Sequence, residues 1–206
     1  MRHDKRIGID FDNTLIDYDE VFRILAREHR LVDGRFCGGK EAVRRAVRTL
    51  PDGEMQWQCL QGQAYGRGIV HAVKFEGAAA FLCGARAAGH EILIVSHKTE
   101  YGHFDPERVN LRAAALAWME RRGFFDDAGL GLSVANVRFA QTRAEKIEAI
   151  GRLDVTHFID DLPEVLDDPA FPPDVVKILF TNGAPSRDAR PNAFAHWRDI
   201  AEAVLR

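Results

Sequence analysis

The segment Lys5–Leu15, which reads KRIGIDFDNTL, constrains the fold of this chain most strongly. Its apolar run, Ile7–Ile9, is too short for a helix and has the composition of a buried strand. The run stops at Asp10, and Asp12 follows two residues later. Because Asp is unfavourable inside strands and favours loops, we expect a first strand whose carboxyl end presents two carboxylates. Open parallel sheets bind ligands at that edge, although on spacing alone a solvated acidic turn fits equally well.

Alternating strand and helix patterns begin at about residue 75. The expected strands span 91–95, 134–140, 155–159 and 175–180. The expected helices span 76–88, 107–122, 142–153 and 193–205. Such alternation is typical of an α/β fold in which parallel strands are joined by right-handed crossover helices. We therefore predict a Rossmann-like parallel sheet flanked by helices.

Two of these helices have clear start signals. Thr142, with Glu145 three residues later, forms a capping-box pattern. Pro106 suits the first position of the helix over 107–122, with Asp105 as its N-cap. These signals predict where both helices begin.

Residues 17–74 lack the alternation of strands and helices. They show helical patterns over 18–30, 40–50 and 54–65, and no convincing strand. This block separates the first strand from the other strands of the expected sheet. We therefore predict a core domain formed by residues 1–16 and 75–206, with a small all-helical insertion at 17–74.

The composition argues against several classes of partner. The net charge of −3 gives no general electrostatic basis for binding nucleic acid or an anionic membrane. No apolar run approaches the roughly 20 residues needed to span a bilayer. Cys37, Cys59 and Cys83 form no CxxC pair and fit reduced thiols, and the segment before the first strand has no room for a signal peptide. We expect a cytoplasmic protein that binds neither nucleic acid nor membrane; the sequence does not predict its oligomeric state.

Polar residues lie near the ends of several expected strands, where they can meet. Asp10 and Asp12 follow the first strand, Ser96 follows the strand over 91–95, and Asp160 and Asp161 follow the strand over 155–159. Lys146 lies on the helix before that last strand. Taken singly, Lys146 suits a solvated helix face, and Ser96 suits a loop cap. Because the carboxyl ends of parallel strands share one edge, the ordered set instead indicates one site.

This ordered set resembles the four sequence motifs of the haloacid dehalogenase-like (HAD) superfamily. DFDNTL at residues 10–15 is similar to its first motif, DxDx[TV], and Ser96 at the end of ILIVS is similar to its second. Lys146 resembles the third motif, and IDDLPE at residues 159–164 resembles the fourth. The resemblance covers nearly the whole chain outside the insertion, which lies where the superfamily places its C1 cap. It implies an HAD-like fold with a small helical C1-type cap.

The resemblance also implies a magnesium-dependent phosphatase. Asp10 would be the nucleophile that forms an aspartyl-phosphate, Lys146 would neutralise charge, and Ser96 would donate a hydrogen bond to a phosphoryl oxygen. Asp12 would protonate the leaving group and then activate water. Superfamily dehalogenases lack this second acid, so Asp12 favours phosphate chemistry over carbon–halogen cleavage.

The same resemblance implies a site for Mg2+. The ion would be held by a carboxylate oxygen of Asp10, the backbone carbonyl of Asp12 and a carboxylate of Asp160, all oxygen ligands that suit magnesium. Asp161 would orient a water bound to the ion. Glu164 lies where many relatives carry a further acid, but the motif also fits relatives that use only the acidic pair. We therefore assign no role to Glu164.

The substrate indicated is a small phosphorylated metabolite, with a sugar phosphate favoured over a nucleotide. Three alternatives stay open: a phosphotransferase or phosphomutase with the same nucleophile, a nucleotide phosphatase, and a non-catalytic binding protein of the same fold. The loop over 97–106 begins at the expected site, so His97 and Lys98 are candidates for recognising the leaving group. An ordinary surface loop fits these residues equally well.

Overall fold

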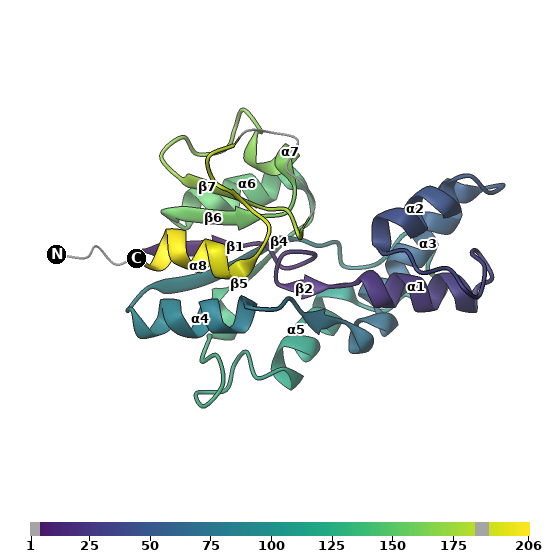
Figure 1. The fold of residues 1–206 in the computed structure, drawn as a ribbon, viewed down its shortest axis with the longest axis horizontal. Helices are drawn as coiled ribbons and strands as arrows, with labels where there is room; N and C mark the ends of the chain where they lie inside the picture. The colour runs from purple at the N-terminus through teal and green to yellow at the C-terminus, as the bar shows by residue number, and fades with distance from the viewer. Residues whose placement is uncertain (1–4, 184–189) are drawn as a thin grey trace. The chain divides into compact units, whose positions relative to one another are not determined.

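A six-stranded parallel sheet lies in the first of two compact units (Figure 1). The computed structural model describes residues 5–183 and 190–206. The strand order is β5-β4-β1-β6-β7-β8. The strands are β1 (Arg6–Ile9), β4 (Glu91–His97), β5 (Val137–Ala140), β6 (His157–Asp160), β7 (Val176–Phe180) and β8 (Ala193–Phe194). Each neighbouring pair runs parallel, which confirms the predicted Rossmann-like sheet.

The first strand, β1, lies inside the sheet between β4 and β6. Ile9 is level with Ile94 of β4 and with Ile159 of β6, and it is fully buried, as expected for a strand covered on both faces. A Cβ atom at Gly8 would lie only 2.6 Å from the ring of Phe158, so this close packing requires glycine. The register places the carboxyl ends of β1, β4 and β6 at one edge of the sheet.

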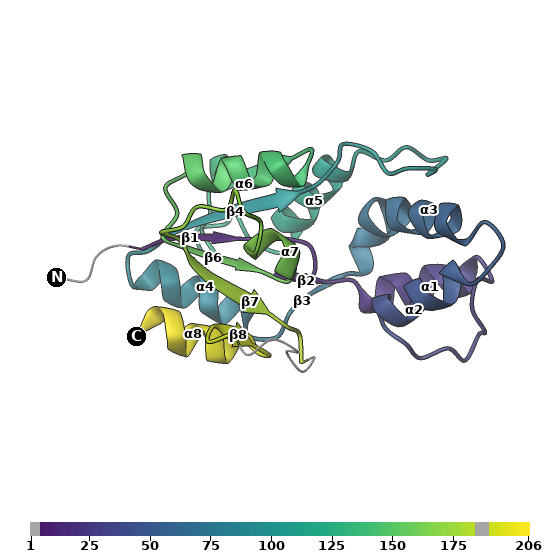
Figure 2. The same ribbon diagram turned by 90° about the horizontal axis from the view of Figure 1, so that it is seen from above.

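Helices cover both faces of this sheet (Figure 2). On one face lies α6 (Arg143–Arg152), and on the other lie α4 (Ala78–Ala87) and α8 (Trp197–Leu205). Ile147 and Ile150 of α6 pack with Val95 of β4 in a buried apolar cluster. A short helix, α7 (Pro163–Leu166), follows β6. Lys146 also belongs to α6, so this apolar packing fixes the helix that carries Lys146 against the sheet.

The beginning of α6 confirms Thr142 as the N-cap, but only half of the predicted capping box forms. The hydroxyl of Thr142 accepts a hydrogen bond from the backbone N–H of Glu145 at 3.1 Å. The carboxylate of Glu145 accepts one from the backbone N–H of Gln141 at 2.7 Å. The first bond satisfies a backbone donor that a helix leaves unpaired at its start. The second goes to the residue before the N-cap, whereas in a capping box it would go to the N–H of the N-cap itself.

The beginning of α5 (Leu111–Arg121) differs from the prediction. The expected start after Pro106, with Asp105 as N-cap, is wrong. Asn110 is the N-cap, because its side chain accepts the capping hydrogen bond at 2.9 Å. Arg108 has a φ of 46°, a left-handed conformation that interrupts a right-handed helix. Pro106 therefore belongs to a turn before the helix.

The ends of several other elements also differ from the sequence pattern. β4 continues to His97, so Ser96 lies inside the strand instead of after it. The strand expected over 134–140 begins at Val137, and residues Ala193–Phe194 form β8 beside β7 instead of starting the last helix. Pairing with a neighbouring strand depends on residues distant in sequence, which a local apolar pattern does not reveal.

The second compact unit comprises Asp17–Val73 and Thr99–Arg122. It contains α1 (Asp19–Glu28), α2 (Lys40–Arg48), α3 (Gly53–Tyr65), the 3-10 helix η1 (Arg67–His71) and α5. The predicted insertion at 17–74 lies almost wholly in this unit. The unit also includes residues 99–122, which the sequence placed in the core domain. The role of the insertion as a cap stays a prediction.

Two short strands lie at the ends of the predicted insertion, where no strand was expected. They are β2 (Ile16–Asp17) and β3 (Val73–Lys74), and they pair in a second, two-stranded sheet. Two residues each are too few to leave a pattern in the sequence. The paired strands therefore lie where the chain first leaves and first re-enters the first unit.

Aromatic side chains fill the interior of the second unit. Phe22 of α1 stacks on Trp57 of α3 with 5.0 Å between ring centroids. Tyr18 meets Tyr65 edge to face at 4.9 Å. These contacts give the helical unit a core of its own. No helix in the described part of the chain has both the length and the apolar character needed to cross a membrane.

Candidate active site

Asp10 and Asp160 come together at the carboxyl edge of the sheet. The backbone N–H of Asp10 donates to the carbonyl of Ile159 at 2.9 Å, which continues the pairing of β1 with β6 past the end of β1. Asp10 is 5% exposed and Asp160 is fully buried. The sheet thus brings two acids from distant parts of the sequence into one buried place, as predicted.

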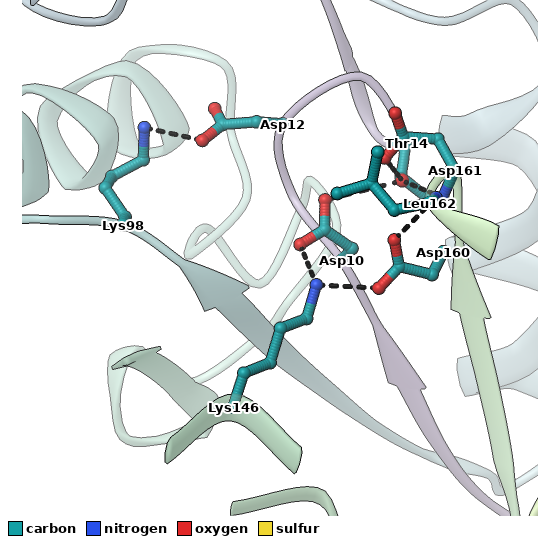
Figure 3. Close-up of polar contacts among 8 residues, drawn as sticks. All are labelled: Asp10, Asp12, Thr14, Lys98, Lys146, Asp160, Asp161 and Leu162. Carbon is teal, nitrogen blue, oxygen red and sulfur yellow. Dashed lines mark hydrogen bonds and ion pairs between the residues drawn. The ribbon is translucent and has the colours of Figure 1, made fainter. Parts of the chain in front are cut away.

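Lys146 of α6 bridges these two acids (Figure 3). Its Nζ atom lies 2.6 Å from Oδ1 of Asp10 and 2.7 Å from Oδ2 of Asp160. The lysine side chain is 1% exposed, so this is a buried ion-pair network and not the solvated helix lysine that its position alone would suggest. Burial lowers the pKa of Lys146, but Asp10 and Asp160 raise it by more, so it lies above its usual value.

The acids at this edge carry more negative charge than Lys146 offsets. Burial raises the pKa of Asp10 to about 7. That value already includes the effect of Lys146, which lowers the pKa, and the smaller effects of Asp160 and then Asp12, which raise it. The shifted pKa shows that the site holds an ionised Asp10 only at a cost, which additional positive charge would remove.

Thr14 connects Asp10 with Asp161. Its hydroxyl accepts a hydrogen bond from the backbone N–H of Asp161 at 3.1 Å. The same hydroxyl lies 3.4 Å from Oδ2 of Asp10 and 3.2 Å from Oδ1 of Asp161, and it donates to one of them at a time. Thr14 is fully buried. We assigned it no role from the sequence, although it occupies the last position of the DxDx[TV] pattern.

The loop after β1 is held by the C-terminal helix as well. The indole N–H of Trp197 in α8 donates to the carbonyl of Thr14 at 3.0 Å. The backbone N–H groups of Leu15 and Ile16 both donate to the carbonyl of Phe11, at 3.0 and 3.2 Å. The loop that carries Asp10 and Asp12 is therefore held by its own backbone hydrogen bonds and by a hydrogen bond from a buried tryptophan.

Ser96 of β4 is fully buried, and its hydroxyl has no hydrogen-bond partner among the residues that the structure describes. A buried hydroxyl without a partner is costly, so such a group calls for an explanation. Ser96 lies two residues past Ile94, which is level with Ile9, and so belongs to the same edge as Asp10. Its hydroxyl is available to donate to a ligand there.

Asp12 pairs with Lys98 and lies outside the carboxylate cluster. Oδ2 of Asp12 lies 2.7 Å from Nζ of Lys98, and the two side chains are 14% and 2% exposed. The Lys98 ammonium also lies 5.9 Å from the centre of the Phe11 ring. The sequence predicted Asp12 at the site but placed Lys98 in a substrate-reading loop, and nothing in the local pattern indicated their pairing.

Carboxylate oxygens of Asp10, Asp160 and Asp161 form a group that could bind a divalent cation. Asp10, Asp160 and Asp161 each offer a carboxylate oxygen, and these oxygens lie within 4.8 Å of one another. With Asp12 included, four carboxylates face two ammonium groups, those of Lys146 and Lys98. When all are ionised, two negative charges are left over, and hard oxygen donors suit Mg2+. The predicted contribution of the Asp12 carbonyl stays a prediction.

Two other residues considered from the sequence, His97 and Glu164, are exposed and do not belong to this cluster. His97 is exposed, and its Nε2 lies 3.1 Å from the carbonyl of Gln141. Glu164 is exposed on α7. The structure thus brings together Asp10, Lys146, Asp160 and Asp161, with Asp12 and Lys98 paired beside them.

Among known proteins, only solved structures are found to be similar to this chain. No family model matches the chain, and no curated protein does. Among solved structures, an HAD family hydrolase from Deinococcus radiodurans with bound phosphate and sodium is 15% identical, with a TM-score of 0.55. That match covers 98% of this chain and 97% of the other.

Two further structures of the same fold differ in the activity ascribed to them. A predicted phosphoglycolate phosphatase from Haemophilus somnus is 16% identical, with a TM-score of 0.58 over 98% of this chain and 99% of the other. A dehalogenase is 14% identical, with a TM-score of 0.50 over 100% and 99%. At such identities the likeness concerns the fold. The chain has the fold of HAD-superfamily hydrolases, as its motifs implied.

Proposed function

We propose that this protein is a magnesium-dependent phosphatase that hydrolyses a small phosphorylated metabolite through an aspartyl-phosphate on Asp10. The observation that carries the proposal is the buried network in which Lys146 joins Asp10 to Asp160, 2.6 and 2.7 Å away. The fold adds support, since one similar structure contains bound phosphate and another is described as a predicted phosphatase.

In the first half of the reaction, a carboxylate oxygen of Asp10 attacks phosphorus. The bond between phosphorus and the leaving oxygen breaks, and Asp12, which enters this step protonated, gives its proton to that oxygen. The Lys146 ammonium offsets charge beside the nucleophile. The hydroxyl of Ser96 donates to a phosphoryl oxygen, which would satisfy a buried group that has no partner within residues 5–183 and 190–206.

In the second half, water attacks the aspartyl-phosphate. Asp12, now ionised, takes a proton from the water, and the bond between phosphorus and Asp10 breaks. Inorganic phosphate leaves, and the Asp10 carboxylate is restored. One acid that first gives and then takes a proton makes both halves possible.

Asp10, Asp160 and Asp161 would hold Mg2+ beside this carboxylate. When bound, the ion would neutralise the charge shared by the acids and the phosphoryl oxygens. Thr14 would keep Asp10 and Asp161 oriented, since its hydroxyl lies within hydrogen-bond distance of both. Lys146 would remain between Asp10 and Asp160, with its ammonium 2.6 and 2.7 Å from their carboxylate oxygens.

Asp12 favours phosphate chemistry over the carbon–halogen cleavage suggested by the similar dehalogenase. An alkoxide leaving group needs a proton, whereas a halide does not, and Asp12 supplies an acid two residues after the nucleophile. A sugar phosphate remains our preferred substrate. A phosphotransferase or phosphomutase, a nucleotide phosphatase and a non-catalytic binding protein are the alternatives.

A screen of phosphorylated metabolites for phosphate release tests the proposal. Sugar phosphates and nucleotides form separate arms, each with Mg2+ and with chelator, and Asp10→Asn serves as the blank. We expect metal-dependent release without any added acceptor. Release only when an acceptor is added would indicate a phosphotransferase, and binding without turnover would indicate a non-catalytic protein.

A further inference from the structure

Lys98 is a buried lysine at the candidate site to which the proposed reaction gives no task. Its backbone N–H donates to the carbonyl of Ala140 at 2.9 Å, so its main chain continues the pairing of β4 with β5. Side chains alternate along a strand. Ser96 and Lys98 are accordingly buried, whereas His97 between them is exposed. Lys98 therefore points to the same side of the strand as Ser96.

The ammonium of Lys98 is already committed to a protein partner. It lies 2.7 Å from Oδ2 of Asp12, with 2% of the lysine side chain exposed, and 5.9 Å from the centre of the Phe11 ring. Direct contact with a leaving group would require breaking a buried ion pair, which leaves a charge without compensation. Lys98 is thus better suited to act on Asp12 than on a substrate.

The two lysines of the site direct the acids to different places. Figure 3 shows the Asp12 carboxylate pointing toward Lys98, and those of Asp10 and Asp160 pointing toward Lys146. Without the Lys98 ammonium, a carboxylate that is only 14% exposed would gain by turning to another positive charge. Lys146 is such a charge at the same site, and a cation held by the acids would be another.

We infer that Lys98 is a positioning residue that holds the Asp12 carboxylate apart from Lys146 and the metal-binding acids, and thereby keeps it directed at the leaving oxygen for proton transfer. The inference rests on the proposed phosphatase function and deepens it. A proton donor must be directed at the leaving oxygen as the bond to phosphorus breaks, and a carboxylate drawn into the metal cluster is not.

Two substrates with different needs for a proton test this inference. Glycerol phosphate has an alkoxide leaving group, whereas p-nitrophenyl phosphate has a stable phenolate that leaves without protonation. The quantity compared is kcat/KM, which covers the steps up to loss of the leaving group. Lys98→Met should lower kcat/KM about 100-fold for glycerol phosphate and by less than about 3-fold for p-nitrophenyl phosphate, as loss of a general acid would. Lys98→Arg should restore much of the loss, since it keeps the charge.

A double-mutant cycle shows whether Lys98 acts through Asp12. Asp12→Asn should likewise lower kcat/KM for glycerol phosphate much more than for p-nitrophenyl phosphate. Adding Lys98→Met to Asp12→Asn should not lower kcat/KM any further. Lys177→Met is the matched control, because its ammonium also lies over a phenylalanine ring, 4.9 Å from the centre of Phe171, while its strand position is level with Phe158 and not with Asp160. It should change neither substrate.

Three results would overturn the inference. Equal losses on both substrates would indicate a general structural role, and additive losses in the double variant would indicate direct contact of Lys98 with substrate. A third is the absence of coupling between Lys98→Met and Asp12→Asn in urea unfolding, which would mean that the ion pair does not form in solution. If the parent releases phosphate and Asp10→Asn does not, any of these results removes the inference alone. If the parent releases none from either substrate, the proposed function fails, and the inference fails with it.

Discussion

Two lysines at the candidate site are equally buried but serve different numbers of acids. The side chain of Lys146 is 1% exposed and that of Lys98 is 2% exposed. Lys146 lies between Asp10 and Asp160, whereas Lys98 pairs with Asp12. The first group keeps a surplus of negative charge, and the second is balanced. A buried lysine thus leaves enough negative charge for a cation beside Asp10 and Asp160, whereas a similarly buried lysine offsets the charge of Asp12.

The largest expected effect comes from Asp10→Asn. The substitution preserves the shape of the side chain but removes the attacking oxygen, so phosphate release should fall by at least about 10⁴-fold, in line with losses of a catalytic nucleophile. Colorimetric phosphate measurement with the best substrate of the screen checks this. Arg152→Ala, which breaks an exposed pair with Glu148, should leave the rate unchanged. Retained activity in a folded Asp10→Asn protein would remove the basis of the comparison.

Lys146→Met should destabilise the protein most. It leaves Asp10 and Asp160 facing each other without the shared ammonium, and breaking a buried pair in this way costs about 3–5 kcal/mol. Urea unfolding in the absence of metal measures the loss. Added Mg2+ should stabilise this variant more than the parent, because the surplus negative charge is larger. The comparison between the two lysines fails if metal-free Lys146→Met unfolds at the same urea concentration as the parent.

Asp160→Asn should weaken metal binding more than it changes the maximal rate. It removes one of the three carboxylates that lie within 4.8 Å of one another. The Mg2+ concentration for half-maximal activity should rise about 10–100-fold, comparable to other perturbations of metal sites. Magnesium titration of the rate provides the measurement, with Glu164→Gln as a control at an exposed acid of α7. An unchanged magnesium requirement would exclude Asp160 as a ligand.

The last expected effect is a pH dependence of stability in metal-free protein. Burial raises the pKa of Asp10 from 3.8 to about 7. The unfolded chain loses this proton near pH 3.8 and the folded chain near pH 7. The contribution of Asp10 to stability is therefore full below the lower value and declines as the pH rises toward the upper one.

Thermal unfolding of parent and Asp10→Asn between pH 4 and pH 7 isolates this contribution, because asparagine does not titrate. The melting temperature of the parent should fall relative to that of the variant across this range. Saturating Mg2+ should remove the trend, since the cation favours the ionised carboxylate. A difference in melting temperature that does not change with pH would mean that the pKa of Asp10 is not raised in the folded protein.

Much of the sheet and the main acids were predictable because each left a local signal. The apolar run before Asp10 marks a buried strand that ends abruptly, and the capping-box pattern at Thr142 marks the helix that carries Lys146. The order of the motifs then indicated that these residues meet. The structure brings Asp10, Lys146 and Asp160 together as the order implied.

What escaped prediction depends on contacts between distant residues. Lys98 pairs with Asp12 from another strand, and no spacing along the chain encodes that pair. The start of α5 followed Asn110 instead of Asp105, because a left-handed residue between them breaks the helical path. Thr14 was visible in the first motif, but its bonds to Asp10 and Asp161 appear only when β1 and β6 are adjacent.

The hydrogen bond from Trp197 to the Thr14 carbonyl has a practical consequence. The chain has three tryptophans, and the other two, Trp57 and Trp118, belong to the second unit. Replacing those two with phenylalanine would leave one indole in contact with the loop that carries the acids. Its emission spectrum would then serve as an optical reporter of events at that loop, readable before any substrate has been identified.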